Sequence, residues 1–503
     1  MTRIPLLVGT RVQVVDAPEG AVVLRPPPPG EAIADVAAAV RDALRYPLAG
    51  PPLSELVPPG GRATILVEPP ALPIPGAQFD PRGRALDAAS LELERAGVPP
   101  SRQTLLVAGG LARRLSQRDV EGLVTRDFAR SFTGRVLVHD VEEPGLVELA
   151  PGLCVNRALV ETDAAIVVSA AQTFLHGGPA ALLSAAGPEA ARAAGADSLL
   201  ETRGSWGWPL ALDLERLLGE RVPLIGASLA LNHPRLGGLL HGYPYDEEAL
   251  ERVARSPLRL AFGALPGPVR ARVLHSLRSE LTASTAYAGP PSVAHAEALL
   301  RSIEIRSVEL DGPVDALCVA VPRTTPHLPR EQPNPLLATY LGLAYALRLW
   351  RDAFPVVEGG TAILVHRFHR TFAHPTQQPY RAFFGAVRLG REPEHLGEAE
   401  RAAAADPRAL DLYRASRACH PVLPFADWAA CRPTLDRLGT VLVAGCRDAV
   451  AARQLGFVPA RSVAAALELV AGTLGRAPRV AFLVTPPFFP IRVSGSPDSP
   501  DEG

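Results

Sequence analysis

The sequence has few cysteines, and their spacing suggests no cross-link. Five occur among 503 residues, no two of them form a C-x-x-C pair, and the odd number leaves one unpaired in any disulfide scheme. This pattern excludes a disulfide framework and the common zinc and iron–sulfur cassettes. It is typical of a reducing compartment, so we expect a cytoplasmic protein.

Targeting and membrane-spanning segments are also lacking. The first residues alternate apolar and polar side chains like a strand and show no charged head, apolar run and cleavage site of a signal peptide. The longest helix-like apolar stretch covers residues 336–350. It is too short to span a bilayer and contains Arg348, so we predict a core helix there and no membrane partner.

Neither sign of charge is in excess. Lys and Arg number 51 and Asp and Glu number 52, which gives a net charge of -1. Nucleic acids are bound by concentrated basic surfaces, so we expect no nucleic-acid partner. Charged residues make up 20% and hydrophobic residues 47% of the chain, which is a globular composition. A chain of this length predicts two or more domains.

Short apolar runs recur along the chain, each followed by a turn and an Ala- and Leu-rich segment with helical spacing. The runs cover residues 63–67, 104–108, 135–139, 164–169 and 222–226 in the first half, and 316–321, 361–366, 440–444 and 480–484 in the second. Continuous apolar runs predict strands covered on both faces, and their alternation with helices predicts parallel sheets. The predicted fold class is α/β, with two lobes of mainly parallel sheets flanked by helices.

A break rich in small residues, Gly and Pro covers residues 281–293 and separates the two series of strands. We therefore place the first lobe at residues 1–285 and the second at 286–493. Residues 494–503 have almost nothing to bury, which predicts a disordered tail. Ligands of open parallel sheets bind beyond the carboxyl ends of the strands, so we expect a ligand cleft between the lobes. The sequence gives no indication of oligomeric state.

The densest group of candidate functional side chains follows the apolar run at 361–366. It contains His366, Arg367, His369, Arg370 and His374. Imidazole is the commonest metal ligand and the usual acid or base near neutral pH. The spacing matches no closed zinc site. Three interpretations remain: a metal site with His366 and His374 as ligands, an acid/base or anion-binding loop, or polar packing with one functional His at most.

Two further loops carry candidates. His176, Gly177 and Gly178 follow a predicted strand, where backbone N–H groups can approach an oxyanion closely, although Gly pairs are also ordinary turns. A Pro-rich loop carries Arg323, His327, Arg330, Glu331 and Asn334, and a loop of this length usually serves a site or a contact. Neither G-x-G-x-x-G nor a Walker sequence occurs, so we expect no nucleotide site of those types.

Four stretches resemble the nickel-dependent lactate racemase family. Residues 91–120 are similar to its helix, AGV-P turn, strand and Gly-x-His-Arg loop, and residues 151–170 are similar to its V-N-R strand. Residues 311–321 and 356–365 resemble strands of its second lobe. The resemblance runs from about residue 61 to 360. It implies two α/β lobes with a site in the cleft, racemisation of a hydroxy acid, and a nickel-pincer nucleotide tethered to a Lys.

The residues that carry this chemistry in the family are replaced here. The aligned positions of its Asp-x-x-Arg pair, its two acid/base His, its tethering Lys and its nickel-binding His fall on Pro69, Leu72, Ala112, Thr173, Leu183 and Leu199. Arg113 persists beside the first His position, and no Lys occurs between residues 140 and 226. A Leu cannot form the bond that the pincer nucleotide requires, so we do not assign this cofactor.

Two main hypotheses follow. The first is an isomerase, of the racemase or epimerase type, that acts on a small hydroxy acid or related anion through a replacement site. Its predicted catalytic residues are His176, His327 and His369, and its predicted substrate-binding residues are Glu68, Arg113, Gly177, Gly178, Arg323 and Arg367. The second is a non-catalytic small-molecule-binding or regulatory relative with the same fold. A metal-dependent hydrolase or lyase that uses the His cluster is a third alternative.

Overall fold

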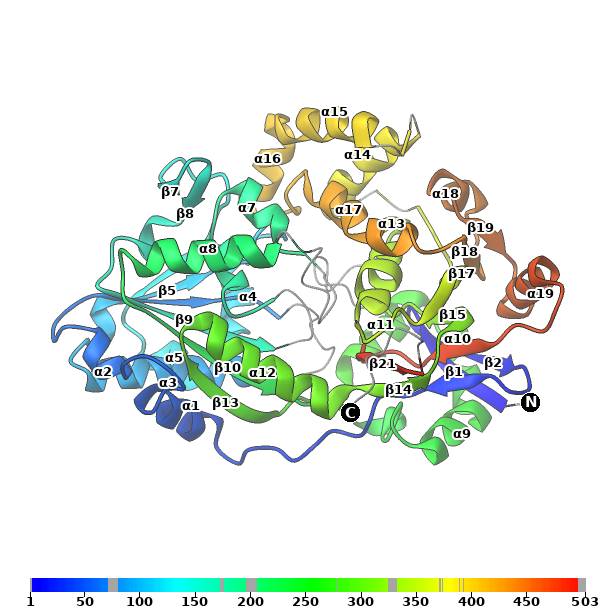
Figure 1. Ribbon diagram of the computed structural model, residues 1–503, viewed down its shortest axis with the longest axis horizontal. Helices are drawn as coiled ribbons and strands as arrows, with labels where there is room; N and C mark the ends of the chain where they lie inside the picture. The colour runs from blue at the N-terminus through cyan, green and yellow to red at the C-terminus, as the bar shows by residue number, and fades with distance from the viewer. Residues whose placement is uncertain are drawn as a thin grey trace.

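The computed structural model describes residues 2–495 except for 71–79, 172–175, 196–204, 206, 278, 324–332, 371, 373, 389 and 392. Two lobes lie side by side, and each is built around a six-stranded sheet (Figure 1). The strands of both sheets are mainly parallel and are flanked by helices. The predicted α/β fold class is therefore confirmed.

The first sheet is parallel except at one edge, where β13 runs antiparallel to β10. Its strands, in spatial order, are β13 (Ala283–Gly289), β10 (Leu224–Leu231), β9 (Ala164–Ala171), β4 (Ala63–Val67), β5 (Gln103–Val107) and β6 (Arg135–Val138). Every residue of β4 and β9 is buried, as expected of central strands covered on both faces.

Helices cover both faces of the first sheet. One face packs against α1 (Val36–Arg45), α2 (Leu53–Leu56), α3 (Pro81–Arg95) and α5 (Arg126–Ser131), and the other against α6 (Ala180–Ser184), α7 (Pro188–Ala193) and α8 (Gly207–Gly219). Asp80 caps α3 by accepting a hydrogen bond from the Arg82 N–H, and Pro81 occupies its first turn. The lobe is completed by α4 (Gln117–Glu121), the hairpin of β7 (Val147–Ala150) and β8 (Leu153–Val155), and α12 (Pro291–Arg306).

The second sheet is parallel throughout. Its strands, in spatial order, are β19 (Val458–Ala460), β18 (Thr440–Ala444), β17 (Val356–Val365), β15 (Val314–Ala320), β20 (Val480–Leu483) and β3 (Val22–Leu24). The nine predicted strand segments all correspond to strands of the two sheets. The prediction missed β3, which joins this sheet from a position about 450 residues earlier in the chain than its partner β20.

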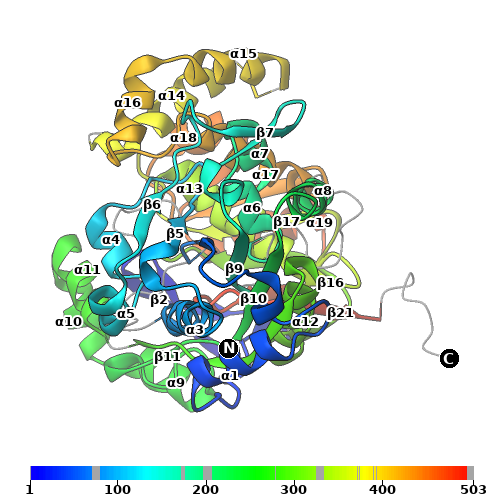
Figure 2. The ribbon, with the colours of Figure 1, turned by 90° about the vertical axis from the view of Figure 1, so that its left-hand side faces the viewer.

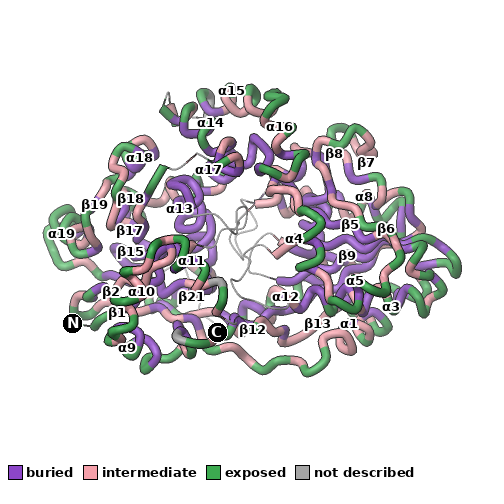
Figure 3. Tube along the Cα trace, turned by 180° about the vertical axis from the view of Figure 1, so that it is seen from behind, coloured by how far each residue is buried: buried purple, intermediate pink, exposed green. Residues whose placement is uncertain are grey.

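Each face of the second sheet has its own cover. One face packs against α13 (Pro335–Thr339), a π-helix η5 (Tyr340–Tyr345), a 3-10 turn η6 (Ala346–Arg348), α14 (Gln378–Val387), α17 (Leu423–Leu435) and α18 (Ala449–Gln454). The other packs against the hairpin of β1 (Thr2–Val8) and β2 (Arg11–Ala17), with α9 (Glu247–Arg255) and α19 (Val463–Leu474). In Figure 3 the central strands β9 and β15 and helix α13 are buried, whereas α15 and α19 carry exposed segments.

Shorter elements complete the second lobe. They are β11 (Arg235–Leu236), α10 (Leu258–Ala264), α11 (Gly267–Ser276), β12 (Ser279–Glu280), β14 (Val308–Asp311), β16 (Trp350–Arg351), α15 (Pro393–Ala404), α16 (Pro407–Arg414) and β21 (Ile491–Ser494). Helix α15 extends toward α7 of the first lobe, as the two views in Figures 1 and 2 show, and Arg192 on α7 donates a hydrogen bond of 2.9 Å to Glu400 on α15.

The predicted core helix at residues 336–350 is present and buried, but it contains a π-helical segment instead of one continuous α-helix. Gly342 lies in this segment, and a Cβ there would overlap the Leu364 side chain of β17. The close approach of helix and strand therefore requires glycine at this position. Among the described residues, no helix combines the length and apolar character needed to cross a membrane.

The chain passes between the lobes more than once. Hairpin β1–β2 and strand β3 pack with the second sheet, and α9 lies against β1, whereas β4, β5, β6, β9 and β10 belong to the first sheet. The predicted boundary between residues 285 and 286 falls inside β13, which pairs with β10. Strand β21 ends at Ser494, where the predicted tail begins, and residues 496–503 lie outside the described residues.

Candidate functional site

A buried carboxylate lies at the carboxyl end of β4. Glu68 accepts hydrogen bonds from the Gly177 N–H at 2.6 Å and from the Ser184 hydroxyl at 2.9 Å. The Nδ1 atom of His176 lies 3.9 Å from Oε1 of the same carboxylate. Burial acts to raise the pKa of Glu68, but His176, Ser184 and the Gly177 amide together outweigh it and lower the pKa below 4.5. Glu68 is therefore ionised at neutral pH.

The turn of His176, Gly177 and Gly178 holds this carboxylate. Gly177 and Gly178 have φ angles of +88° and +53°, and a Cβ on either would overlap the His295 ring. The Gly178 N–H donates to the Ser169 hydroxyl at 3.0 Å. Of the two glycine amides expected to approach an anion, that of Gly177 donates to the carboxylate of Glu68 and that of Gly178 to a hydroxyl. The turn fixes His176 next to an ionised carboxylate.

His295 of α12 packs against the turn. Its ring is buried, and its Nδ1 lies 3.1 Å from the Ser228 hydroxyl, which in turn lies 3.3 Å from Ser169. Burial lowers the pKa of His295 to about 4, so the ring is neutral at pH 7. This role was not predictable from sequence, because His295 occurs within an ordinary helical pattern.

A cavity of about 240 Å³ lies between the lobes beside this turn. Its first-lobe wall includes Glu68, His176, Ser184 and residues 108–112, which follow the carboxyl ends of β4, β9 and β5. Its second-lobe wall includes Tyr340, Arg348 and Asp427, from η5, η6 and α17. The His176 side chain is 23% exposed, whereas that of Glu68 is 9% exposed. The imidazole is therefore the more accessible of the two groups at the cavity wall.

The second-lobe wall carries three polar side chains in an otherwise apolar region. Arg348 and Asp427 are buried, and Asp427 accepts a hydrogen bond of 3.2 Å from the Tyr380 hydroxyl. Burial raises the pKa of Tyr340 well above its usual value, with Asp427 and Cys431 adding to the effect, so the phenol stays protonated. π-Helical segments such as the one that carries Tyr340 frequently occur at functional sites.

The prediction missed these residues because the stretch at 336–350 was interpreted as core alone. The available signal was Arg348, since an Arg inside an apolar stretch must be paired or serve a ligand when it is buried.

Arg113, the remaining predicted site residue of the first lobe, contacts the second lobe. Arg113 donates to Asp119 at 3.0 Å and, across the lobe boundary, to the carbonyl of Ser416 at 3.2 Å. Leu111, two residues earlier, lines the cavity. The Leu111 carbonyl accepts a hydrogen bond from the His420 N–H of the second lobe at 2.9 Å. The loop after β5 is thus attached to the second lobe.

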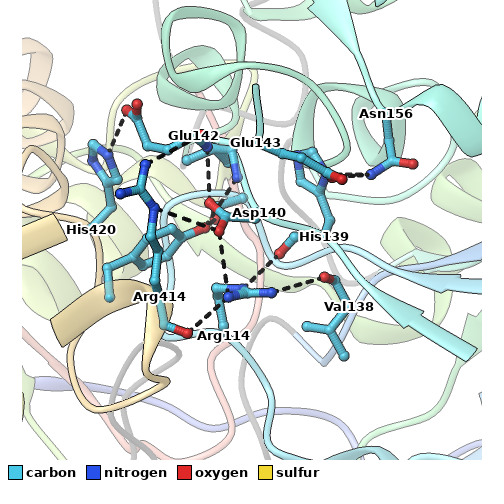
Figure 4. Close-up of polar contacts among 12 residues, drawn as sticks. Arg114, Val138, His139, Asp140, Glu142, Glu143, Asn156, Arg414 and His420 are labelled. Atoms are coloured by element: carbon cyan, nitrogen blue, oxygen red, sulfur yellow. Dashed lines mark hydrogen bonds and ion pairs between the residues drawn. The ribbon is translucent and has the colours of Figure 1, made fainter. Parts of the chain in front are cut away.

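A polar network beside this loop joins the two lobes (Figure 4). Arg114 donates to the carbonyl of Arg414 at 2.8 Å, and Asp140 lies within 3.4 Å of Arg114 and 4.0 Å of Arg414. Nε2 of the buried His420 ring lies 3.1 Å from Oε1 of Glu142. A hydrogen bond with His420 lowers the pKa of Glu142, so this carboxylate is ionised at neutral pH. These contacts fix the relative position of the two walls.

The predicted histidine cluster does not converge in the described structure. His366 is buried, its Nδ1 accepts from the Phe368 N–H at 3.2 Å, and burial lowers its pKa to about 4. His369 and His374 are exposed, and Nδ1 of His374 lies 2.8 Å from the Thr376 hydroxyl. No three His, Cys, Asp or Glu side chains of the described residues come close enough together to hold a metal ion.

The remaining predicted residues either do not line the cavity or lie outside the described residues. His327 falls in the undescribed segment 324–332. Arg323 and Arg367 are half-buried and follow β15 and β17. Of the predicted site residues, the structure brings Glu68, His176, Gly177 and Gly178 together, and only Glu68 and His176 are among the described residues that line the cavity.

The residues present do not fit a lysine-tethered nucleotide. Leu183, at the position aligned with the tethering Lys, is fully buried in α6. No Lys occurs anywhere in the sequence, so none can be supplied from another segment.

Comparisons with known proteins agree with the fold. Residues 9–177 match the family described as the lactate racemase N-terminal domain. The structure of the lactate racemase apoprotein from Thermoanaerobacterium thermosaccharolyticum matches with a TM-score of 0.59 at 14% identity, covering 98% of this chain and 100% of that chain. A Thermotoga maritima protein matches with a TM-score of 0.45 at 12% identity, covering 86% of this chain and 92% of that one. No curated protein sequence matches. Residues 9–177 are therefore similar to the lactate racemase N-terminal domain, and the chain has the fold of lactate racemase.

Proposed function

We propose that this protein binds a small hydroxy acid or related carboxylate in the cavity between its lobes and interconverts its stereoisomers by proton transfer at His176. The observation that carries the proposal is the pairing of a partly exposed imidazole with a buried, ionised carboxylate on the cavity wall. Such a carboxylate can hold the ring in position at the cavity wall, as a general base requires.

The opposite wall supplies the other groups that the reaction needs. The guanidinium of Arg348 can hold the substrate carboxylate and stabilise the negative charge that develops when the α-proton leaves. Inversion also needs a proton donor on the second face of the α-carbon. Tyr340 remains protonated and lines the second-lobe wall, so we assign it this role. No step of this scheme uses a nucleotide cofactor.

A direct test is chiral analysis of the products from single enantiomers of small 2-hydroxy acids. We expect the purified protein to convert one enantiomer into the racemate, and His176→Asn to lose this activity while it keeps its melting temperature. Conversion at an unchanged rate by His176→Asn would show that another group performs the chemistry.

A second candidate function is binding without turnover. It is favoured by the replacement of the family's acid/base His by Ala112 and of its tethering Lys by Leu183, since neither side chain can take part in chemistry. Saturable binding of a hydroxy acid in calorimetry, with no change in its configuration over long incubation, would support this function over the first.

A further inference from the structure

Three loops meet at the carboxyl edge of the second sheet, on the side that carries the β1–β2 hairpin. The Gly9 N–H at the tip of the hairpin donates to the Val321 carbonyl at 2.9 Å, directly after β15. The His366 N–H donates to the Ala444 carbonyl at 3.2 Å, so the loops after β17 and β18 also run side by side. Ligands of parallel sheets bind at this edge.

Four arginines come together here. Arg11 follows the hairpin tip, and Arg367 and Arg447 follow β17 and β18, with the Arg447 N–H bonded to the Arg367 carbonyl at 3.0 Å. Arg270 of α11 is buried and donates from Nε to the Thr10 hydroxyl at 3.3 Å. The guanidinium of Arg270 therefore lies at the same edge of the sheet as the hairpin tip.

Among the described residues, no carboxylate pairs with this cluster of positive charge. None of the four arginines forms an ion pair with an Asp or Glu of the described residues, and the nearby Asp448 is paired with Arg370 at 2.7 Å. Burial, followed by the charges of Arg447, Arg11 and Arg270, lowers the pKa of Arg367. Burial and the charge of Arg11 lower the pKa of Arg270. Arg270 is buried and also donates to the carbonyls of Gly263 and Leu265, whereas Arg11 and Arg367 are half-buried and Arg447 is exposed. Like charges gathered without a counter-charge repel one another, and a bound anion would relieve this repulsion.

We propose that Arg11, Arg270, Arg367 and Arg447 form a binding site for a phosphate group, either inorganic phosphate or the phosphate of a small metabolite. The planar, forked guanidinium matches phosphate oxygens in pairs, and several guanidinium groups suit a dianion better than a monocarboxylate.

The site is separate from the interlobe cavity. The second-lobe wall of the cavity comes from η5, η6 and α17, which cover the face of the sheet opposite the hairpin. The phosphate site therefore does not depend on the function proposed for the cavity.

Calorimetric titration of the full chain with inorganic phosphate, at constant ionic strength, tests the site. We expect saturable binding of one phosphate, weakened about tenfold or more in Arg11→Gln and Arg367→Gln, each of which removes a charge-assisted contact. Arg370→Gln is the matched control, because Arg370 lies in the same loop as Arg367 but is already neutralised by Asp448. We expect the control to bind phosphate within about twofold of the wild type.

Thermal unfolding without phosphate gives an independent readout. Removal of one repelling charge by Arg11→Gln or Arg367→Gln should leave the melting temperature unchanged or raise it, which a merely structural arginine would not do. Pyrophosphate and a phosphorylated hydroxy acid, titrated in parallel, distinguish free phosphate from a metabolite as the ligand. The proposal is overturned if phosphate does not saturate, if all three variants lose affinity equally, or if both cluster variants lower the melting temperature in the absence of phosphate.

Discussion

Replacement of Glu68 by Gln tests the centre of the candidate site. Gln has the same shape, so it keeps one acceptor for the Gly177 N–H and can donate to the Ser184 hydroxyl, but it removes the charge. A hydrogen bond to a charged group contributes about 1.5–3 kcal/mol and a neutral one about 0.5–1.5 kcal/mol. Two bonds are weakened, so we expect a loss of about 2–3 kcal/mol in stability at pH 7. This corresponds to a fall of about 2–3 °C in melting temperature, because the unfolding entropy of a chain of 503 residues is about 1 kcal/mol/K.

The pH dependence gives the sign of the effect. The folded pKa of Glu68 lies below its ordinary value of 4.5, so its stabilising contribution is fully present above pH 4.5. It is lost as the pH falls through the folded pKa. The difference in melting temperature between wild type and Glu68→Gln should therefore shrink in increasingly acidic buffers.

Scanning calorimetry from pH 7 downward measures both effects, with the exposed Glu94→Gln as control. We expect the control to stay within about 0.5 kcal/mol of the wild type. Equal melting temperatures of wild type and Glu68→Gln at pH 7, or a difference that persists at acidic pH, would refute the reasoning about the buried carboxylate.

Three further predictions concern the turn, the cavity and the contact between the lobes. Gly178→Ala should lower the stability by more than Gly50→Ala, measured by thermal unfolding, because both positions have positive φ but only Gly178 packs against His295. Arg348→Gln should weaken binding of a hydroxy acid by about tenfold or more in calorimetry, since it removes the guanidinium from the cavity wall; unchanged affinity would place the carboxylate elsewhere. Arg114→Met removes hydrogen bonds to three carbonyls and should cost about 2–4 kcal/mol of stability, measured as a lower melting temperature. An unchanged melting temperature would show that the polar network does not hold the lobes together.

The sequence predicted much of the fold because its central strands are continuous apolar runs. β4 and β18 were predicted to the residue, and the other seven predicted strands to within a few residues of their ends. It did not predict β3 or the packing of the β1–β2 hairpin on the second sheet. Both depend on contacts between segments far apart in the chain, which local periodicity does not record.

The candidate site was predictable on one wall only. Glu68 and His176 follow apolar strands, and the position rule for parallel sheets identified them as candidates that the structure places together. Tyr340 and Arg348 of the opposite wall lie in a helical stretch that was predicted to belong to the core because it is apolar. His366 was predicted as a metal ligand because of its neighbours in sequence, whereas its ring is buried against Phe368 and the exposed His369 and His374 lie apart from it.

The most direct test of proton transfer at His176 is the fate of the α-hydrogen of a hydroxy acid in heavy water. When a single enantiomer is incubated with the protein in D₂O, NMR should show deuterium entering the α-position as the configuration inverts, and neither change should occur with His176→Asn. Inversion that retains the original hydrogen at the α-carbon would contradict the account, because it would mean that the hydrogen moves as a hydride and never exchanges with solvent.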